Sequence, residues 1–220
     1  NNVSHAVRMG VIVKSGKKYK MTPIGKALLA DKSIYSSVSK EQLLKYYCVN
    51  KDDGTILFPY RAILRIFLTF DYVTRFEFLY CIYSMRSTSD DAVQEAIERI
   101  QYLRDTYPNI DILSEANKEK VLDILNTKYD VQFGFKDIWT SRTTTYNQFN
   151  FFKKHLWRFD NIFITTENKT DKEKIRINAG VQPSIQELLD LTAEIEIVAQ
   201  SGDISKLNKL YGKRIVSTDL

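Results

Sequence analysis

A run of polar side chains between residues 142 and 154 has the chemistry needed to read DNA. Asn and Gln side chains can make paired hydrogen bonds to adenine, Arg can do the same to guanine, and Lys and Thr reach phosphate oxygens. At the α-helical period these polar residues gather on one side of a helix. The candidate base and groove contacts are Arg142, Thr143, Asn147, Gln148 and Asn150, and the candidate phosphate contacts are Lys153 and Lys154.

The other side of this helix carries an apolar stripe. Spacings of four, three and four residues align Thr145, Phe149, Phe152 and Leu156, which predicts a face that packs on the core. Phe151 falls near the polar side, so we expect it to contact a neighbouring part of the molecule. An ordinary amphipathic helix whose polar face meets only water has the same pattern, and helical phase alone leaves that alternative open.

A lysine-rich hairpin near the N-terminal end is a second candidate contact. Residues 11–14 and 19–22 alternate like strands around the turn Ser15-Gly-Lys-Lys. Four lysines without an acid among them suit a phosphate backbone, namely Lys14, Lys17, Lys18 and Lys20. Thr22 and Pro23 then predict a capped helix. A basic turn can also be a solvated loop, so the hairpin alone does not decide between the two.

The order of elements around residues 142–156 is typical of a winged helix. Strands are predicted at 161–165 and 174–178, joined by a charged turn in which residues 167–174 hold three acids and three lysines. Upstream, residues 59–70 and 74–85 predict two helices, the second capped by Thr74. They suit a helix-turn-helix pair, and a plain buried αα-hairpin is the alternative. Amphipathic helices at 89–106 and 117–128 are interpreted as an insertion between the second and third helices.

The predicted fold is mainly α with small β-hairpin wings, an α+β class built from tandem winged-helix-like subdomains. Residues 1–57 form a partial first winged helix, truncated at its N-terminus, and a connector. Residues 58–182 form the second, with the helical insertion at 87–140. Residues 183–220 form C-terminal helices, opened by a Ser184–Glu187 capping box, and a tail that we expect to lead to a further domain.

The search for a catalytic or metal centre gives no catalytic residue and no metal ligand set. His5 and His155 have no acidic or cysteine neighbours at ligand spacing. Asp160, Glu167 and Lys169 are the residue types of a magnesium-dependent nuclease, but two of them fall on a predicted exposed turn, where a preorganised site is hard to build. We therefore expect no cofactor to bind within this chain.

Composition agrees with a folded protein that can bind a polyanion. The chain has 220 residues, 44% of them hydrophobic, and a formal net charge of +5, which permits a sizeable core and is compatible with nucleic acid. Cys48 and Cys81 lie in apolar contexts, which predicts buried free thiols and a reducing, cytoplasmic compartment. No segment is apolar over the length needed to cross a bilayer, so no membrane contact is expected.

Three of these segments together resemble the DNA-recognition region of AlwI-like type IIS restriction endonucleases. They are the hairpin that runs into Thr22-Pro-Ile-Gly-Lys-Ala-Leu-Leu, the helical segment Phe58-Pro-Tyr-Arg-Ala-Ile-Leu, and Arg142-Thr-Thr-Thr-Tyr ahead of the second wing. The resemblance covers most of the chain. It implies two winged helices that bind an asymmetric double-stranded DNA site, and a separate Mg²⁺-dependent nuclease domain, after residue 220 or on a second subunit. This sequence departs from the family pattern at the second wing, whose residues 167–174 have no net charge, whereas a wing that binds phosphate would be basic.

Two other functions fit the same pattern. A winged-helix transcriptional regulator would bind a palindrome as a two-fold dimer, whereas two unlike winged helices in one chain favour an asymmetric site. A winged-helix protein-interaction scaffold would explain the neutral second wing and Phe151. Salt separates the scaffold from the DNA binders, because phosphate binding weakens steeply as salt rises.

Overall fold

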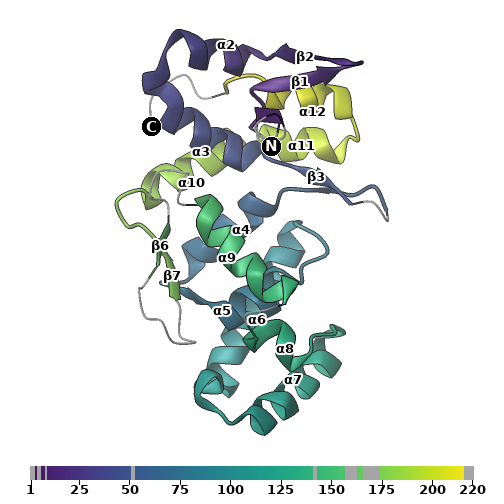
Figure 1. The fold of residues 1–220 in the computed structure, drawn as a ribbon, viewed down its shortest axis with the longest axis vertical. Helices are drawn as coiled ribbons and strands as arrows, with labels where there is room; N and C mark the ends of the chain where they lie inside the picture. The colour runs from purple at the N-terminus through teal and green to yellow at the C-terminus, as the bar shows by residue number, and fades with distance from the viewer. Residues whose placement is uncertain are drawn as a thin grey trace. The chain divides into compact units, whose positions relative to one another are not determined.

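The computed structural model describes residues 3, 6–7, 9–50, 53–140, 143–156, 163–165 and 174–215 (Figure 1). The fold is mainly helical with small antiparallel sheets, which confirms the predicted α+β class with hairpin wings. The chain divides into two compact units, one made of residues 1–64 and 179–220 and the other of residues 65–178. The sequence prediction instead placed residues 183–220 in a separate C-terminal part.

The first unit joins the two ends of the chain. Its N-terminal part contains β1 (Ile12–Ser15), β2 (Lys18–Met21), α2 (Pro23–Ala30), a 3-10 turn (Lys32–Ile34), α3 (Tyr35–Lys45), β3 (Cys48–Val49) and β4 (Ile56–Leu57). Its C-terminal part contains α10 (Gln182–Leu191), α11 (Glu194–Gln200) and α12 (Ile204–Tyr211). Phe58, Ile195, Val198 and Leu207 form a shared buried cluster, so the two parts have a common core.

The lysine hairpin is tighter than predicted. β1 and β2 pair antiparallel up to Ser15 and Lys18, which leaves only Gly16 and Lys17 in the turn. Gly16 has φ +62°, whereas Lys17 has a negative φ, and this combination is the type II′ turn that suits strand twist. Thr22 caps α2 by accepting a hydrogen bond from the Gly25 amide at 3.2 Å, as predicted.

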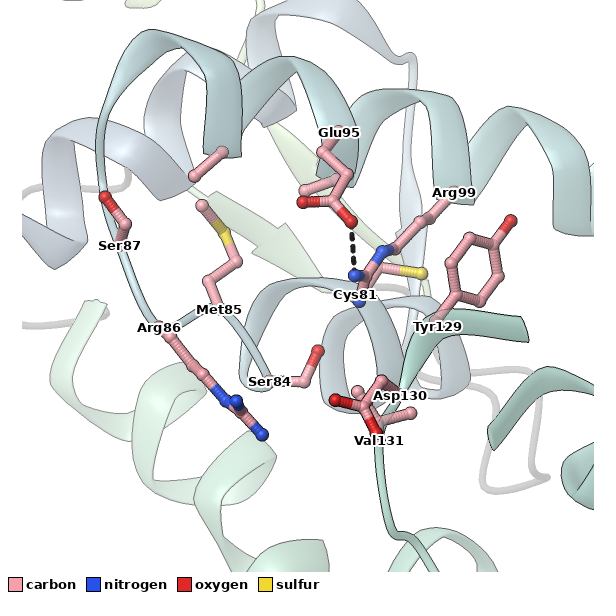
Figure 2. Close-up of a pocket in the computed structure, with 12 residues that line it drawn as sticks. Cys81, Ser84, Met85, Arg86, Ser87, Glu95, Arg99, Tyr129, Asp130 and Val131 are labelled. Carbon is pink, nitrogen blue, oxygen red and sulfur yellow. Dashed lines mark hydrogen bonds and ion pairs between the residues drawn. The ribbon is translucent and has the colours of Figure 1, made fainter. Parts of the chain in front are cut away.

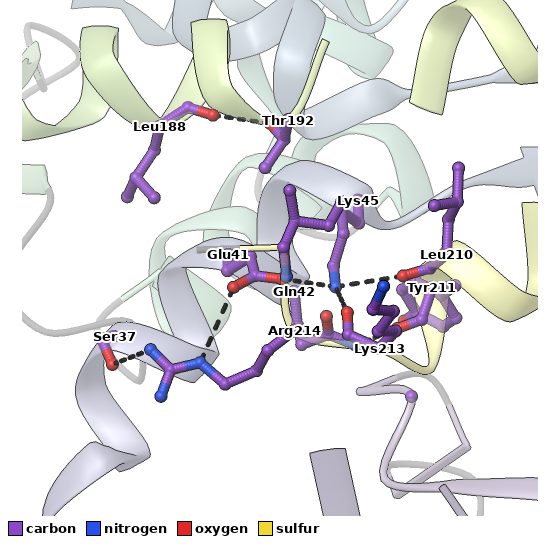
Figure 3. A network of polar contacts seen from close by, with 12 residues as sticks. Ser37, Glu41, Gln42, Lys45, Leu188, Thr192, Leu210, Tyr211, Lys213 and Arg214 are labelled. Atoms are coloured by element: carbon purple, nitrogen blue, oxygen red, sulfur yellow. Dashed lines mark hydrogen bonds and ion pairs between the residues drawn. The ribbon is translucent and has the colours of Figure 1, made fainter. Parts of the chain in front are cut away.

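A buried lysine ties the C-terminal segment to α3 (Figure 3). The Lys45 ammonium donates to Glu41 Oε1 at 2.6 Å and to the carbonyl oxygens of Leu210 and Lys213 at 3.3 and 2.7 Å. The Gln42 amide donates to the Tyr211 carbonyl at 2.9 Å. Burial lowers the pKa of Lys45 to about 8 against the opposing effect of Glu41. These bonds complete the last turn of α12, where helical carbonyls lack partners.

One detail of the predicted C-terminal helices is wrong. The Ser184–Glu187 capping box does not form, because α10 already begins at Gln182 and the Ser184 hydroxyl donates back to the Val181 carbonyl at 2.9 Å. α10 ends near Thr192, whose hydroxyl donates to the Leu188 carbonyl at 2.6 Å, and α11 begins as a separate helix. The final helix does form, with the Asp203 carboxylate accepting from the Lys206 amide.

The second unit follows the order of a winged helix. α4 (Pro59–Thr69), within which the boundary between units falls, precedes β5 (Val73–Thr74), α5 (Arg75–Glu77) and a π-helix (Phe78–Ile82). After an insertion come α9 (Thr144–Leu156), β6 (Phe163–Thr165) and β7 (Lys174–Ile177). The sheet order is β5-β7-β6 with antiparallel pairs, so the first strand pairs with the last, as in a wing. α9 therefore stands in the place of the third helix.

Three helices and a 3-10 turn occupy the segment that the sequence interpretation took as an insertion. The segment contains α6 (Asp90–Thr106), a 3-10 turn (Ile110–Ile112), α7 (Glu115–Tyr129) and α8 (Phe135–Trp139). Arg104 of α6 joins these helices to α5, because its guanidinium donates to Glu77 at 2.6 and 3.0 Å. Glu77 also completes the predicted cap at Thr74, whose amide donates to the Glu77 carboxylate at 2.7 Å.

The apolar stripe of α9 is part of the core of the second unit. Phe149 is 0% exposed, and its ring meets the Phe78 ring edge-on at 5.5 Å. Phe152 lies 4.5 Å from Phe78 and 6.2 Å from Phe67, measured between ring centroids. These contacts confirm the predicted inward face for the two phenylalanines, while Thr145 is only half-buried. The side chains of Phe151 and Leu156 lie outside the described residues.

Candidate nucleic-acid interface

Asn147 and Asn150 lie on the side of α9 away from its buried phenylalanines, and Gln148 lies on the flank between the two faces. Asn147, Gln148 and Asn150 are partly exposed. Within the part of the chain that the structure describes, their side chains make no hydrogen bond, whereas Phe149 and Phe152 fill the core. An Asn or Gln amide carries both donors and an acceptor. Folding leaves these groups available for a ligand that presents both, as a base edge does.

Thr143, predicted as a groove contact, makes local hydrogen bonds at the start of α9. It precedes α9, its carbonyl accepts from the Asn147 amide at 3.2 Å, and its hydroxyl lies 3.3 Å from the carbonyls of Lys136 and Thr140. The residue therefore fixes the start of the helix against α8. Arg142 lies outside the described residues, and for Lys153 and Lys154 the structure describes the helical backbone but not the side chains.

The four hairpin lysines are all exposed. The register opposes Ser15 to Lys18 and Val13 to Lys20, which puts Lys18 and Lys20 on one face of the ribbon. Lys14 opposes Tyr19 on the other face, and Lys17 occupies the tip. Residues 1–30 contain six Lys or Arg and no Asp or Glu. The hairpin is thus the most exposed part of a uniformly basic segment, which suits a polyanion.

The central strand of the second wing has a basic outer face that the sequence interpretation missed. Ile175 is 1% exposed and faces the core with Val73, so Lys174 and Arg176 point to the opposite side. The Lys174 ammonium lies 3.7 Å from the centroid of the Tyr72 ring, and the Arg176 guanidinium lies 5.9 Å from it. The alternation Lys-Ile-Arg-Ile carried this signal, but the neutral total charge of the preceding turn concealed it.

A cavity in the second unit is poorly suited to a polyanion (Figure 2). It has a volume of about 210 Å³ and is lined by two cations and two anions, Arg86, Arg99, Glu95 and Asp130. Arg99 pairs with Glu95 along α6. Burial raises the pKa of the Cys81 thiol at its wall, which keeps the sulfur protonated. The mixed charges cancel, so this cavity adds nothing to the basic surfaces.

Both cysteines are free, Cys81 buried as predicted and Cys48 only half-buried. No group of three or more His, Cys, Asp or Glu side chains that could hold a metal ion occurs among the described residues. Asp160, Glu167, Lys169 and His5 lie outside them, as does the side chain of His155. In the described part of the chain, no helix is long and apolar enough to cross a membrane.

Comparison with known proteins gives no assignment. No protein-family model matches the chain, and no curated protein matches it significantly. The features of the chain that bear on function are therefore the two basic hairpins and the polar face of α9.

Proposed function

We propose that this chain binds double-stranded DNA in a sequence-specific manner, with α9 as the helix that enters the major groove. The observation that carries the proposal is that α9 has one face buried in the core and another face with amides that are free in the described part of the chain. Its phenylalanines are buried, while the amides of Asn147, Gln148 and Asn150 have no partner among the described residues. Amides in this position can pair with the two hydrogen-bonding groups of adenine in the major groove.

The two wings supply the electrostatic part of this proposal. Lys14, Lys17, Lys18 and Lys20 are exposed on the first hairpin, and Arg176 is exposed on β7 beside Lys174. Exposed cations on a narrow ribbon can follow a phosphate backbone, and each contact releases counterions. Lys153, Lys154 and Arg142 extend the same role to the helix by their sequence positions. The contacts of the wings would set affinity, and those of α9 would set base preference.

We further propose that the chain is the recognition part of a type IIS restriction endonuclease in a restriction-modification system. This rests on the sequence resemblance and on the winged-helix order of the second unit. The Mg²⁺-dependent nuclease centre would lie outside residues 1–220. Free Cys48 and Cys81 support a reducing, cytoplasmic location.

Selection from a randomised duplex pool at two salt concentrations tests the binding proposal. One short asymmetric motif, retained less well at the higher salt, is the expected result. A palindromic motif would instead favour a dimeric winged-helix regulator. Absence of both enrichment and salt-dependent retention would contradict DNA binding.

Protein interaction is the second candidate, and exposed apolar side chains on the first hairpin favour it. Val13, Tyr19 and Met21 are 44%, 51% and 42% exposed. Apolar groups of this kind contribute to protein interfaces. A partner held by them would remain bound when salt rises, which distinguishes this function from phosphate binding.

A further inference from the structure

The first unit contains a hollow whose walls are aromatic. Its volume is about 350 Å³. The walls come from the edge strand β1, from the segment that follows α3, and from the end of α12, and they include Ile12, Val13, Tyr46, Tyr47 and Tyr211. Figure 1 shows β1 and α12 side by side in this unit. Binding pockets for small organic ligands begin at about 300 Å³, so the hollow can hold one flat ring system.

Two of the tyrosines form a rigid corner. The ring centroids of Tyr47 and Tyr211 are 5.9 Å apart, and the ring planes meet at 78°. Tyr47 also packs on buried Phe58 at 6.3 Å, and Phe58 belongs to the core of the unit. Since the core holds these rings in place, the corner is formed before any ligand arrives. Aromatic side chains held in this way are the usual surfaces on which nucleobases stack.

Two residues that line the hollow have polar groups without a full set of hydrogen-bond partners in the described structure. The Tyr211 hydroxyl is buried and has no hydrogen-bond partner among the described residues. Burial raises the pKa of this hydroxyl, so it stays protonated and can donate. The Tyr47 hydroxyl donates to Asn208 Oδ1 at 2.7 Å, which leaves the amide nitrogen of Asn208 with its two protons. Buried polar groups in proteins normally have partners, so the unpaired buried hydroxyl of a residue that lines the hollow points to a missing one.

The charge around the hollow indicates what kind of ring it accepts. β1 forms one wall through Ile12 and Val13, and the same strand continues into Lys14 and the basic turn. A ring attached to a phosphate backbone would satisfy both features, because the ring fits the tyrosine corner and the phosphates meet the lysines. A neutral aromatic ligand would use only the first.

We propose that this hollow receives a single nucleobase unstacked from the DNA that the first hairpin holds. The inference rests on the proposed DNA binding and adds a site to it. Extrusion of a base costs stacking and pairing energy, which is smaller at a mismatch. Stacking on Tyr47, together with hydrogen bonds from the Tyr211 hydroxyl and the Asn208 amide to acceptors on the base, would offset that cost.

The test measures affinity for duplexes that carry a mismatch at each position of the selected motif in turn. A mismatch at one position should tighten binding by the whole chain about tenfold. The mismatched base has already lost its pairing, so its extrusion costs less free energy. Tyr211→Phe keeps the ring and removes only the hydroxyl, so it should reduce this preference several-fold while leaving the affinity for matched duplex nearly unchanged. Tyr35→Phe, at an exposed tyrosine outside the hollow, is the matched control.

A fluorescence measurement helps to distinguish a failure of the proposed base site from a failure of the proposed DNA binding. 2-Aminopurine placed at the preferred position should change its emission on binding, and Tyr47→Ala should abolish the change. If matched and mismatched duplexes bind equally at every position, the base site is wrong and DNA binding stands. Equal weakening of all duplexes by Tyr211→Phe would assign the hydroxyl a general structural role and overturn the base site. If the wild type binds no duplex, the proposed function fails and this inference fails with it.

Discussion

At the scale of single residues, the most informative groups are the amides of α9, because folding does not use them. Replacing Asn147 or Asn150 with Ala should weaken binding to the preferred motif by about 1–3 kcal/mol and relax the preference at one base pair. Stability should change little, since neither side chain has a hydrogen-bond partner in the described structure. Affinities for a panel of single-base variants of the motif measure the effect.

Thr144→Ala is the matched control for these variants. Thr144 lies exposed in the first turn of the same helix. The Thr144→Ala variant should have the same base preference as the wild type. Uniform weakening towards every sequence in the Asn147 and Asn150 variants would show that the amides do not read bases.

Lys45 makes a separate residue-scale prediction about stability and pH. Its folded pKa of about 8 lies below the ordinary 10.5, so between these values the unfolded chain binds more protons than the folded one. The contribution of Lys45 to the unfolding free energy should therefore rise with pH across this window, at no more than about 1.4 kcal/mol per pH unit. Burial raises the pKa of Tyr211, which opposes the rise above pH 10.

Urea unfolding between pH 7.5 and 10 compares the wild type with Lys45→Met. The variant is expected to lack the rise, because the titrating ammonium is gone while Glu41 still accepts from the Ile215 amide at 2.8 Å. Parallel pH profiles for the two proteins would show that the Lys45 ammonium keeps its ordinary pKa in the fold.

At the scale of elements, the structure shows why some features could be predicted and others could not. The caps at Thr22 and Thr74 and the stripe of Phe149 and Phe152 depend on residues within about one turn, so local sequence was sufficient. α3 was missed, because its polar residues look like a solvated surface. Lys45 is fully buried there, and its carbonyl partners lie 165 and 168 positions away. The pattern of residues around Lys45 in the sequence cannot predict partners so far away along the chain.

The surface proposed to contact DNA was only partly predictable for a related reason. Helical phase located the amides of α9, but the basic face of β7 depends on which side of the strand is buried. Ile175 decides that side by packing with Val73, about 100 positions earlier in the chain. Pairing between distant strands, rather than composition, exposes Arg176.

The first hairpin should raise the affinity for DNA of every sequence and should not contribute to the preference for particular bases. Lys17→Ala combined with Lys18→Ala should weaken binding to all sequences alike and lower the slope of log affinity against log salt by about two, one for each lost phosphate contact. The control is Lys120→Ala with Lys206→Ala, which makes the same charge change at exposed positions on α7 and α12. Titrations at four salt concentrations measure both slopes. Equal slopes for the two double variants would place the phosphate contacts elsewhere.

At the scale of the whole molecule, the two units differ in construction. The first combines a hairpin and α2 with C-terminal helices held by α3, while the second has a three-stranded antiparallel sheet, α9 and the helices α6 to α8. Unlike units in one chain have no internal two-fold symmetry, whereas a symmetric dimer is what a palindromic site requires. For the DNA binding proposed above, this arrangement favours one chain on one asymmetric site.

Sedimentation of the chain with a duplex that carries the selected motif tests this stoichiometry. One chain per duplex is expected over a tenfold range of protein concentration, because a monomer occupies the site completely. Non-specific binding adds further chains as the DNA lengthens, so the duplex should extend only a few base pairs beyond the motif. Cooperative binding of two chains to this short duplex would contradict the monomeric recognition module. It would favour the regulator instead, since a two-fold dimer fills both half-sites together.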